Sequence, residues 1–263
     1  MDNTVKEPLI HLSKREDMSF GKKWLVRIIA ILLSLIVCAG FIFIIIKMNP
    51  VEVYEGIVEG AVGTGRRFWV TARDALTLLC VAVAVTPAFK MKFWNIGAEG
   101  QILMGCVASA AMMIYAGNAL PTGLLLVLMF VCSFIAGGIW GIIPAFFKAR
   151  WNTNETLFTL MLNYVAMQVV TFCIVYWENP AGSNSVGIIN APTRAGWLPQ
   201  LFGLDYGWNL AIVLLLTVLM FIYMKRTKHG YEIAVVGESE NTARYAGINV
   251  GKVIVRTVGI SGG

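Results

Sequence analysis

Long apolar runs alternate with short polar stretches along almost the whole chain. The first run, Ile28 to Ile46, contains no charged residue. A helix rising about 1.5 Å per residue over this run crosses the ~30 Å hydrocarbon core of a bilayer. Further runs of this kind cover residues 75–89, 101–116, 122–147, the segment from 153 to the polar residues at 178, and 207–224. The pattern predicts an all-α polytopic membrane protein with about six complete transmembrane helices and the start of a seventh.

The second run is short and contains Pro87. We expect its helix to be kinked there, or to be extended outward by a turn at residues 68–74. Arg73 and Asp74 lie in that turn, and we interpret them as two solvated charges rather than as an ion pair. The preceding segment, Lys47 to Arg67, is predicted to be external. A short surface helix is only weakly indicated there, because glycines interrupt it.

The last apolar run, Lys252 to Gly263, is too short to cross a membrane, since about a dozen helical residues span only ~18 Å. A half-span without partners leaves backbone polar groups exposed to lipid. We therefore predict that the transmembrane domain, residues 24–263, is incomplete at its C-terminal end and does not transport alone. Residues 1–23 are polar and of mixed charge, and are interpreted as a cytoplasmic tail.

The composition supports a membrane protein, with 57% hydrophobic residues, 14% charged residues and a mean hydropathy of +0.71. In a typical soluble domain, about a quarter of the residues are charged. The pI of about 9.1 does not indicate nucleic-acid binding, because the basic residues recur between apolar runs as orientation signals do. Of 21 Lys and Arg, all fall on segments assigned to the cytoplasm except Lys47, Arg66, Arg67, Arg73 and Arg194.

This asymmetry predicts a cell-membrane protein with a cytoplasmic N-terminus. Residues 178–206, rich in Pro, Gly, Asn and Ser, then form an external loop, and residues 225–252 form a cytoplasmic loop. All five cysteines lie inside apolar runs with no metal-ligand spacing, so no metal site or cofactor is predicted. The chain contains no Walker-type phosphate loop, so it supplies no nucleotide site of its own.

The first candidate site is the stretch NIGAEGQ, which lies between two apolar runs. It places Asn95, Glu99 and Gln101 beside two glycines at a membrane boundary. An ionisable group at that position is costly and usually functional, which favours a translocation pathway or its gate. The alternative is that Asn95 caps a helix and Glu99 occupies its positive first turn.

Asn163 is a further candidate, eight residues beyond Glu155 in the stretch TNETLFTLMLNYVA. The two residues share a helical face about 12 Å apart along the axis. Asn154 or Thr153 is expected to cap this helix, with Glu155 in its first turn. Interhelical hydrogen bonding by Asn163 is at least as common as ligand contact.

The cytoplasmic loop predicts a short helix over residues 238–248, bracketed by Gly237 and Gly247. Its acids come first and Arg244 comes last, as the helix dipole favours. Tyr245 is the expected anchor for a protein partner, and Ala243 is expected to allow that partner to approach closely. A solvated turn between two spans is the alternative.

FWNIGAEGQ and the stretch NETLFTLMLNY resemble permease subunits of ATP-binding-cassette importers that take up nucleosides, simple sugars and branched-chain amino acids. The resemblance covers roughly residues 50–263, and the intact GAEGQ is most similar to the nucleoside branch. Phe158 departs from the pattern, since a small polar residue is usual there. The resemblance implies an importer in which this chain does no covalent chemistry and has no catalytic residues.

The implied partners are an ATPase subunit, a second permease subunit that is identical or homologous, and an extracellular or lipid-anchored solute-binding protein. Membrane lipid is also an expected partner, and nucleic acid is not. The predicted pathway or gate residues are Asn95, Glu99, Gln101 and Asn163, on the evidence of their residue types and positions given above. The implied ATPase-coupling residues are Glu238, Glu240, Ala243, Arg244, Tyr245 and Gly247.

Other functions remain alternatives at this point. A simple-sugar permease of the same family suits the same amides. An ion-driven secondary transporter more often shows paired acids at the membrane midplane, whereas Glu99 and Glu155 are both expected near the cytoplasmic interface. An intramembrane enzyme is disfavoured because the sequence contains no HExxH or GxSxG motif.

Overall fold

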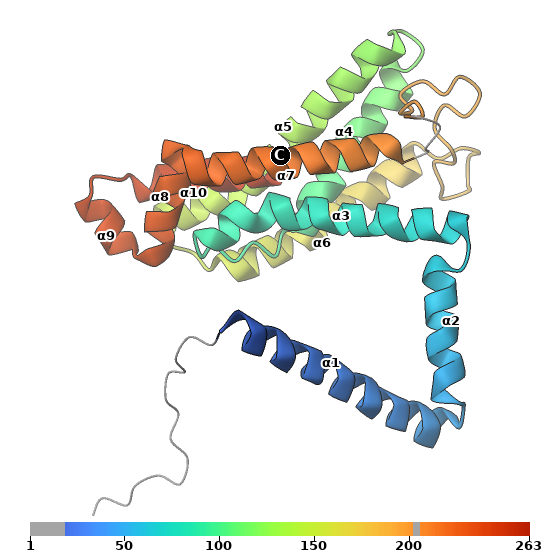
Figure 1. Cartoon of the computed structure of the whole chain (residues 1–263). Coiled ribbons are helices and arrows are strands. Elements are labelled where there is room, and N and C mark those ends of the chain that lie inside the picture. The colour runs from blue at the N-terminus through green and yellow to red at the C-terminus, as the bar shows by residue number, and fades with distance from the viewer. Residues whose placement is uncertain (1–18, 202–205) are drawn as a thin grey trace, which may run out of the picture. The chain divides into compact units, whose positions relative to one another are not determined.

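The computed structural model describes residues 19–201 and 206–263, and the regular elements of these residues are all helices (Figure 1). Six helices are long and apolar enough to cross a membrane, which confirms a polytopic helical membrane protein. They are α1 with the π-helical turn that follows it (Phe20–Phe41 and Ile42–Ile46), α3 (Gly65–Lys90), α4 (Ala98–Ala116), α5 (Thr122–Trp151), α6 (Glu155–Tyr176) and α7 (Gly207–Arg226). The shorter helices are α2 (Pro50–Val62), α8 (Lys228–Glu238), α9 (Glu240–Tyr245) and α10 (Val250–Gly262).

The chain divides into two units, residues 1–68 and 69–263. In the first unit, α1 begins at Phe20, earlier than the predicted boundary at residue 23, and residues 1–18 of the predicted tail lie outside the described residues. The weakly indicated surface helix is a full helix, α2. Asn49 caps it by accepting a hydrogen bond from the Val51 amide at 3.0 Å, and Pro50 occupies the first helical position, where proline is favoured.

The predicted turn at residues 68–74 is wrong, because these residues are helical within α3. The stretch contains no glycine or proline, so nothing in its backbone interrupts the helix. Arg73 and Asp74 also form an ion pair, with Nη2 and Oδ1 2.8 Å apart, rather than staying separately solvated. Both side chains are exposed, so this pair contributes little to stability.

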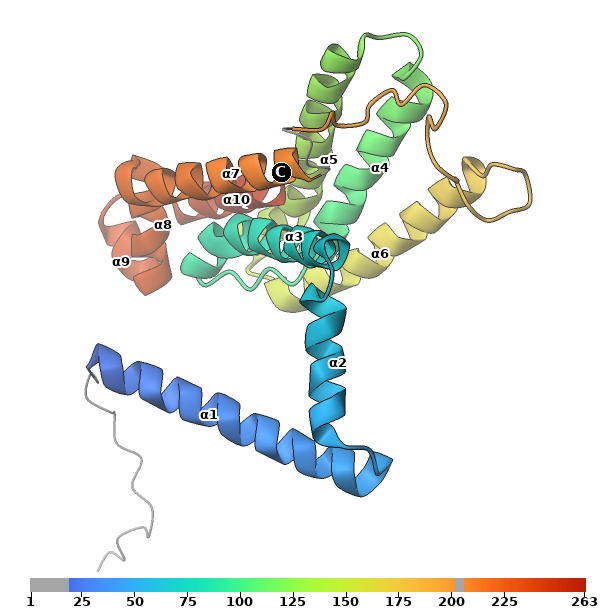
Figure 2. The same ribbon diagram turned by 45° about the vertical axis from the view of Figure 1, so that its right-hand side comes forward.

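In the second unit, α5 lies between α4 and α10 and packs extensively on both (Figure 2). The predicted spans over residues 101–116 and 122–147 form the α4–α5 hairpin, in which Ser133 Oγ of α5 donates to the Gly105 carbonyl of α4 at 3.0 Å. The GxxxG step of α5 is a site of close approach. A Cβ atom at Gly137 would collide with the Gly262 carbonyl of α10, and one at Gly141 would lie 2.9 Å from the Val258 carbonyl.

The predicted helix over residues 238–248 is shorter than expected and is preceded by a helix that the sequence did not predict. Ser239 caps α9 by accepting from the Thr242 amide at 3.3 Å, so Glu238 belongs to the end of α8. Gly247, with a φ of 76°, follows the helix as predicted. Gly237 does not bracket it but lies inside α8, where a Cβ atom would collide with the Lys90 carbonyl.

The predicted external loop packs on the α4–α5 hairpin, apart from residues 202–205, which lie outside the described residues. Asn190 Nδ2 donates to the Met113 carbonyl of α4 at 2.8 Å. A Cβ atom at Gly196 would lie 3.4 Å from Leu125 of α5, which is fully buried. The middle of the loop is therefore fixed to the hairpin.

Candidate functional site

The segment between α3 and α4 is held by an amide pair. Asn95 Nδ2 donates to Gln101 Oε1 at 3.2 Å, and Gln101 Nε2 donates back to Asn95 Oδ1 at 3.4 Å. The same Oδ1 accepts from the Gly97 amide at 3.0 Å. Both side chains are buried, with 3% and 5% of their surface exposed. Buried amides need such partners because an unpaired one costs free energy.

Asn163 of α6 completes this network from across the helix interface. Its Oδ1 accepts from the Gly100 amide at 2.9 Å, and its Nδ2 donates to the Ile96 carbonyl at 3.0 Å. Gly100 lies in the first turn of α4, where amides lack an intrahelical partner. Asn163 therefore caps α4 from another helix. We call Asn95, Gln101 and Asn163 the amide cluster.

The glycines of the segment allow this close approach. A Cβ atom at Gly100 would lie 2.9 Å from Asn163 Oδ1, and one at Gly97 would lie 3.0 Å from the Thr159 Cβ atom. Thr159 is fully buried and was missed in the sequence, although it precedes Asn163 by one helical turn on the same face. The indole nitrogen of Trp140 is buried next to Gly100 without a hydrogen-bond partner in the described residues, and no sequence signal marks it.

Glu99 differs from the amides that surround it in sequence. Its side chain is exposed in the first turn of α4, and none of the hydrogen bonds or ion pairs of the described residues involves it. Glu155, in contrast, pairs with Lys148, with Oε2 and Nζ 2.9 Å apart and both side chains mostly buried. Glu99 is thus an exposed carboxylate at the start of α4, whereas Glu155 is paired.

The second predicted site lies on α8 and α9, which pack on the α3–α4 segment. Ala243 of α9 and Val236 of α8 share one buried core with Met91 and Phe93. Ala243 is fully buried, whereas Tyr245 is 93% exposed. Ala243 was expected to face a partner, but its methyl group is covered by this chain, because the short helix α9 buries the face that carries it.

The remaining predicted coupling residues lie at the surface around Tyr245. Arg244 pairs with Glu240, with Nη2 and Oε2 3.6 Å apart and both side chains exposed. A small pocket of about 160 Å³ lies between the junction of α8 with α9 and the facing ends of α5 and α6. Its lining includes Lys92, Lys148, Glu155, Glu238 and Glu240. The two predicted sites are therefore neighbours, joined by residues 91–93.

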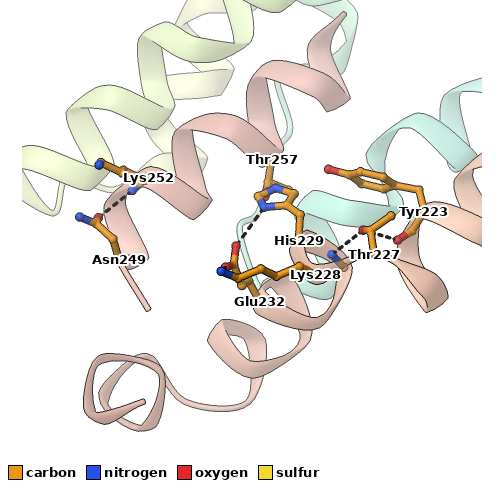
Figure 3. A network of polar contacts seen from close by, with 9 residues as sticks. Tyr223, Thr227, Lys228, His229, Glu232, Asn249, Lys252 and Thr257 are labelled. Atoms are coloured by element: carbon orange, nitrogen blue, oxygen red, sulfur yellow. Dashed lines mark hydrogen bonds and ion pairs between the residues drawn. The ribbon is translucent and has the colours of Figure 1, made fainter. Parts of the chain in front are cut away.

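Buried His229 joins α8 to α10 and was not singled out from the sequence (Figure 3). Its Nε2 lies 3.1 Å from Thr257 Oγ1, and its Nδ1 lies 3.3 Å from Glu232 Oε2. Burial lowers the pKa of His229, and the hydrogen bond that its ring makes to the Glu232 carboxylate opposes this shift. The neutral ring can donate to the carboxylate and accept from the hydroxyl, so the contact fixes α8 to α10.

Several known transporters are similar to this chain. It is 30% identical to the guanosine ABC transporter permease protein NupP of Bacillus subtilis over 90% of this chain and 68% of the relative. It is 28% identical to the nucleoside ABC transporter permease protein NupB of Lactococcus lactis subsp. cremoris over 92% of this chain and 68% of the relative. It is also 28% identical to the glucose ABC transporter permease protein TsgB13 of Haloferax volcanii over 82% of this chain and 59% of the relative.

No solved structure matches the chain significantly. The family described as the permease component of branched-chain amino acid transport systems matches residues 69–263. This range contains the amide cluster, Glu99, and helices α8 to α10. The chain therefore belongs to this family of transport permeases.

Proposed function

We propose that this chain is the membrane-spanning subunit of an ABC importer that moves a nucleoside across the cell membrane, with ATP hydrolysis in a separate partner subunit. The observation that carries the proposal is the 30% identity to a guanosine permease over 90% of the chain. A second relative of similar coverage is a nucleoside permease. The solute moves through the protein without covalent change, so no catalytic residue is required.

In this proposal the α3–α4 segment forms part of the gate. Glu99 faces the route, because its exposed carboxylate has no partner in the described residues. The amide cluster braces the backbone beneath it, because all three amides are buried and bonded to the segment or to each other. A carboxylate suits a nucleoside, whose sugar hydroxyls and base amino groups donate hydrogen bonds.

The ATPase subunit docks on the exposed face of α8 and α9 in the same proposal. Tyr245 is the anchor, since a large aromatic side chain with 93% of its surface exposed is well placed to be buried by a partner. Glu238, Glu240, Arg244 and Gly247 surround it at the surface. Ala243 does not touch the ATPase subunit itself. It connects α9 to the gate segment, because it packs in the core that contains Phe93. Movement of the docked helix is thus passed to the gate segment.

The remaining topology follows from the distribution of basic residues. We place the N-terminus and helices α8 and α9 in the cytoplasm, and residues 178–206 outside. A solute-binding protein contacts that loop, and Arg194 is an exposed residue on it. A second permease subunit, identical or homologous, completes the pore. The fixed position of the loop on the α4–α5 hairpin gives the binding protein a preformed surface.

A simple sugar is the second candidate solute, favoured by the similarity to a glucose permease. Competition for uptake separates the two. With the whole transporter in vesicles, excess unlabelled guanosine should abolish uptake of labelled guanosine, while excess glucose or ribose should leave it unchanged. Saturable uptake of labelled glucose that guanosine does not inhibit would replace the nucleoside proposal by the sugar one.

A further inference from the structure

A long groove runs between α5 and α10, away from the amide cluster. It encloses about 830 Å³, which is within the range of small-molecule sites. The two helices run antiparallel along it, since Gly251 lies next to Ala149 and Gly262 lies next to Gly137. From Phe134 to Arg150 the groove extends about 24 Å along α5, which is longer than one leaflet of a ~30 Å hydrocarbon core.

The residues that line the groove change from apolar to basic along its length. Most of its wall is apolar, formed by side chains such as Ile135, Ile139 and Phe146 of α5 and Val255 of α10. A wall of this kind suits hydrocarbon chains and offers no hydrogen bonds to a sugar or a nucleobase.

One end of the groove is basic. Arg150, Lys252 and Arg256 line it, and the lining includes no acidic residue. All three are exposed, and none belongs to the ion pairs of the described residues. Lys252 and Arg256 are four residues apart on one face of α10, where two like charges destabilise a helix. An anion bound between them would remove that cost.

The basic face of α10 is distinct from the face that holds the core. Lys252 lies on the side of α10 next to α5, whereas Thr257 points to His229 on the other side (Figure 3). Val253 and Val258 belong to the buried face, with 4% and 0% of their surface exposed. The cations of the groove are therefore not needed to pack α10, and their common position indicates a ligand.

We propose that this groove binds an anionic phospholipid, with its acyl chains along α5 and its phosphate at Arg150, Lys252 and Arg256. An apolar groove that ends in cations matches a lipid with a negatively charged headgroup better than a zwitterionic one. A soluble anion would leave the apolar wall empty, and an apolar protein helix would leave the cations unpaired. This binding is independent of the solute that the chain carries.

Native mass spectrometry of the detergent-purified chain tests the proposal with equal amounts of phosphatidylglycerol and phosphatidylcholine of identical acyl chains. Wild type should retain phosphatidylglycerol preferentially. Each of Arg150→Gln, Lys252→Gln and Arg256→Gln should reduce that preference about fivefold, and the triple variant should abolish it. Ile139→Trp, which fills the apolar wall without changing charge, should reduce retention of both lipids.

The matched control is Lys225→Gln with Arg226→Gln, two exposed cations at the end of α7 that do not line the groove. This variant should keep the wild-type preference. Equal retention of both lipids by wild type, or an equal loss in the control, would overturn the proposal. Full displacement of the lipid by glycerol phosphate would also overturn it, because the site would then be one for a soluble anion. A dimer that excludes lipid from the groove would assign the groove to a second subunit instead.

Discussion

At the residue scale, the amide cluster joins α6 to the segment between α3 and α4 through buried hydrogen bonds. Asn163 satisfies the Gly100 amide and the Ile96 carbonyl at once. From the sequence alone it was open whether Asn163 bonds to a neighbouring helix or to a ligand. The structure supports the first role, because the side chain has only 4% of its surface exposed.

Replacing Asn163 by Leu should destabilise the protein by about 1–3 kcal/mol, because a buried donor and acceptor lose their partners. Thermal unfolding of the purified protein measures the loss. Gln168→Leu is the matched control, since Gln168 lies on the same helix but is exposed, and it should leave the transition unchanged. Equal transitions for wild type and Asn163→Leu would show that α4 does not depend on this cap.

Glu99→Gln should behave differently, because the side chain has no partner to lose in the described residues. We expect normal membrane insertion and stability with uptake of solute reduced by about tenfold or more, since a hydrogen-bonded charge contributes on the order of 1.5–3 kcal/mol. Uptake by the assembled transporter at saturating binding protein is the measurement. Wild-type uptake in this variant would remove Glu99 from the route.

His229 makes the contact between α8 and α10 sensitive to acid. Because burial lowers its pKa in the folded state below the usual value, the unfolded chain binds more protons on acidification. The stability from this group is complete above about pH 6.5 and is lost as the pH falls through that value toward the folded pKa. The groups facing the ring are Glu232, Tyr223 and Thr257, with Arg256 acting from α10.

The corresponding measurement is the change in thermal unfolding temperature between pH 5.5 and 7.5. His229→Gln should flatten this change, while His11→Gln, at the second histidine of the chain, should not. If both variants follow the wild-type profile, other groups set the acid sensitivity.

At the scale of elements, hydrophobic pattern predicted the long helices well and the short ones poorly. The runs beginning at 101, 122 and 207 appear as α4, α5 and α7 with small shifts at their ends, because length and apolarity alone define such helices. Helix α8 was missed because glycines 230 and 237 resemble helix breakers. Both are contact points, where a Cβ atom would collide with the carbonyls of Met224 and Lys90.

Gly237→Ala should therefore push α8 away from the end of α3. We expect a stability loss on the order of 1–3 kcal/mol, as for other overpacked sites, together with easier proteolysis of the segment around α9. Gly251→Ala is the control, because a Cβ atom there makes only ordinary contact with Ala149 at 3.5 Å. It should be neutral or slightly stabilising, since Ala favours helix over Gly. Identical behaviour of the two variants would contradict the close packing of α8 on α3.

At the scale of the whole molecule, one buried core joins the two candidate sites. The exposed face of α9 is the proposed ATPase dock, and its buried face packs with Phe93 next to the amide cluster. The sequence predicted two candidate sites but not the contact between them, because nothing in the spacing shows that segments about 150 residues apart share a core. The contact depends on the tertiary packing of Ala243, which is fully buried in this chain although its sequence position predicted contact with a partner.

Tyr245→Asp tests the dock without disturbing the core, because this side chain is 93% exposed. The variant should fold normally and lose the ATPase subunit on co-purification, with at least a tenfold drop in the amount recovered. Tyr231→Asp, at an exposed tyrosine of α8, maps how far the interface extends. Full recovery of the ATPase with Tyr245→Asp would show that α9 is a connecting segment and not the dock.

In the proposed function, ATP hydrolysis in a partner subunit drives a nucleoside across the membrane. The most direct test is uptake of labelled guanosine into vesicles that contain the whole transporter, with both permease subunits, its ATPase and its binding protein. We predict accumulation against a gradient that requires ATP and is unchanged when proton and sodium gradients are collapsed. Accumulation driven by an ion gradient in the absence of ATP would contradict the account.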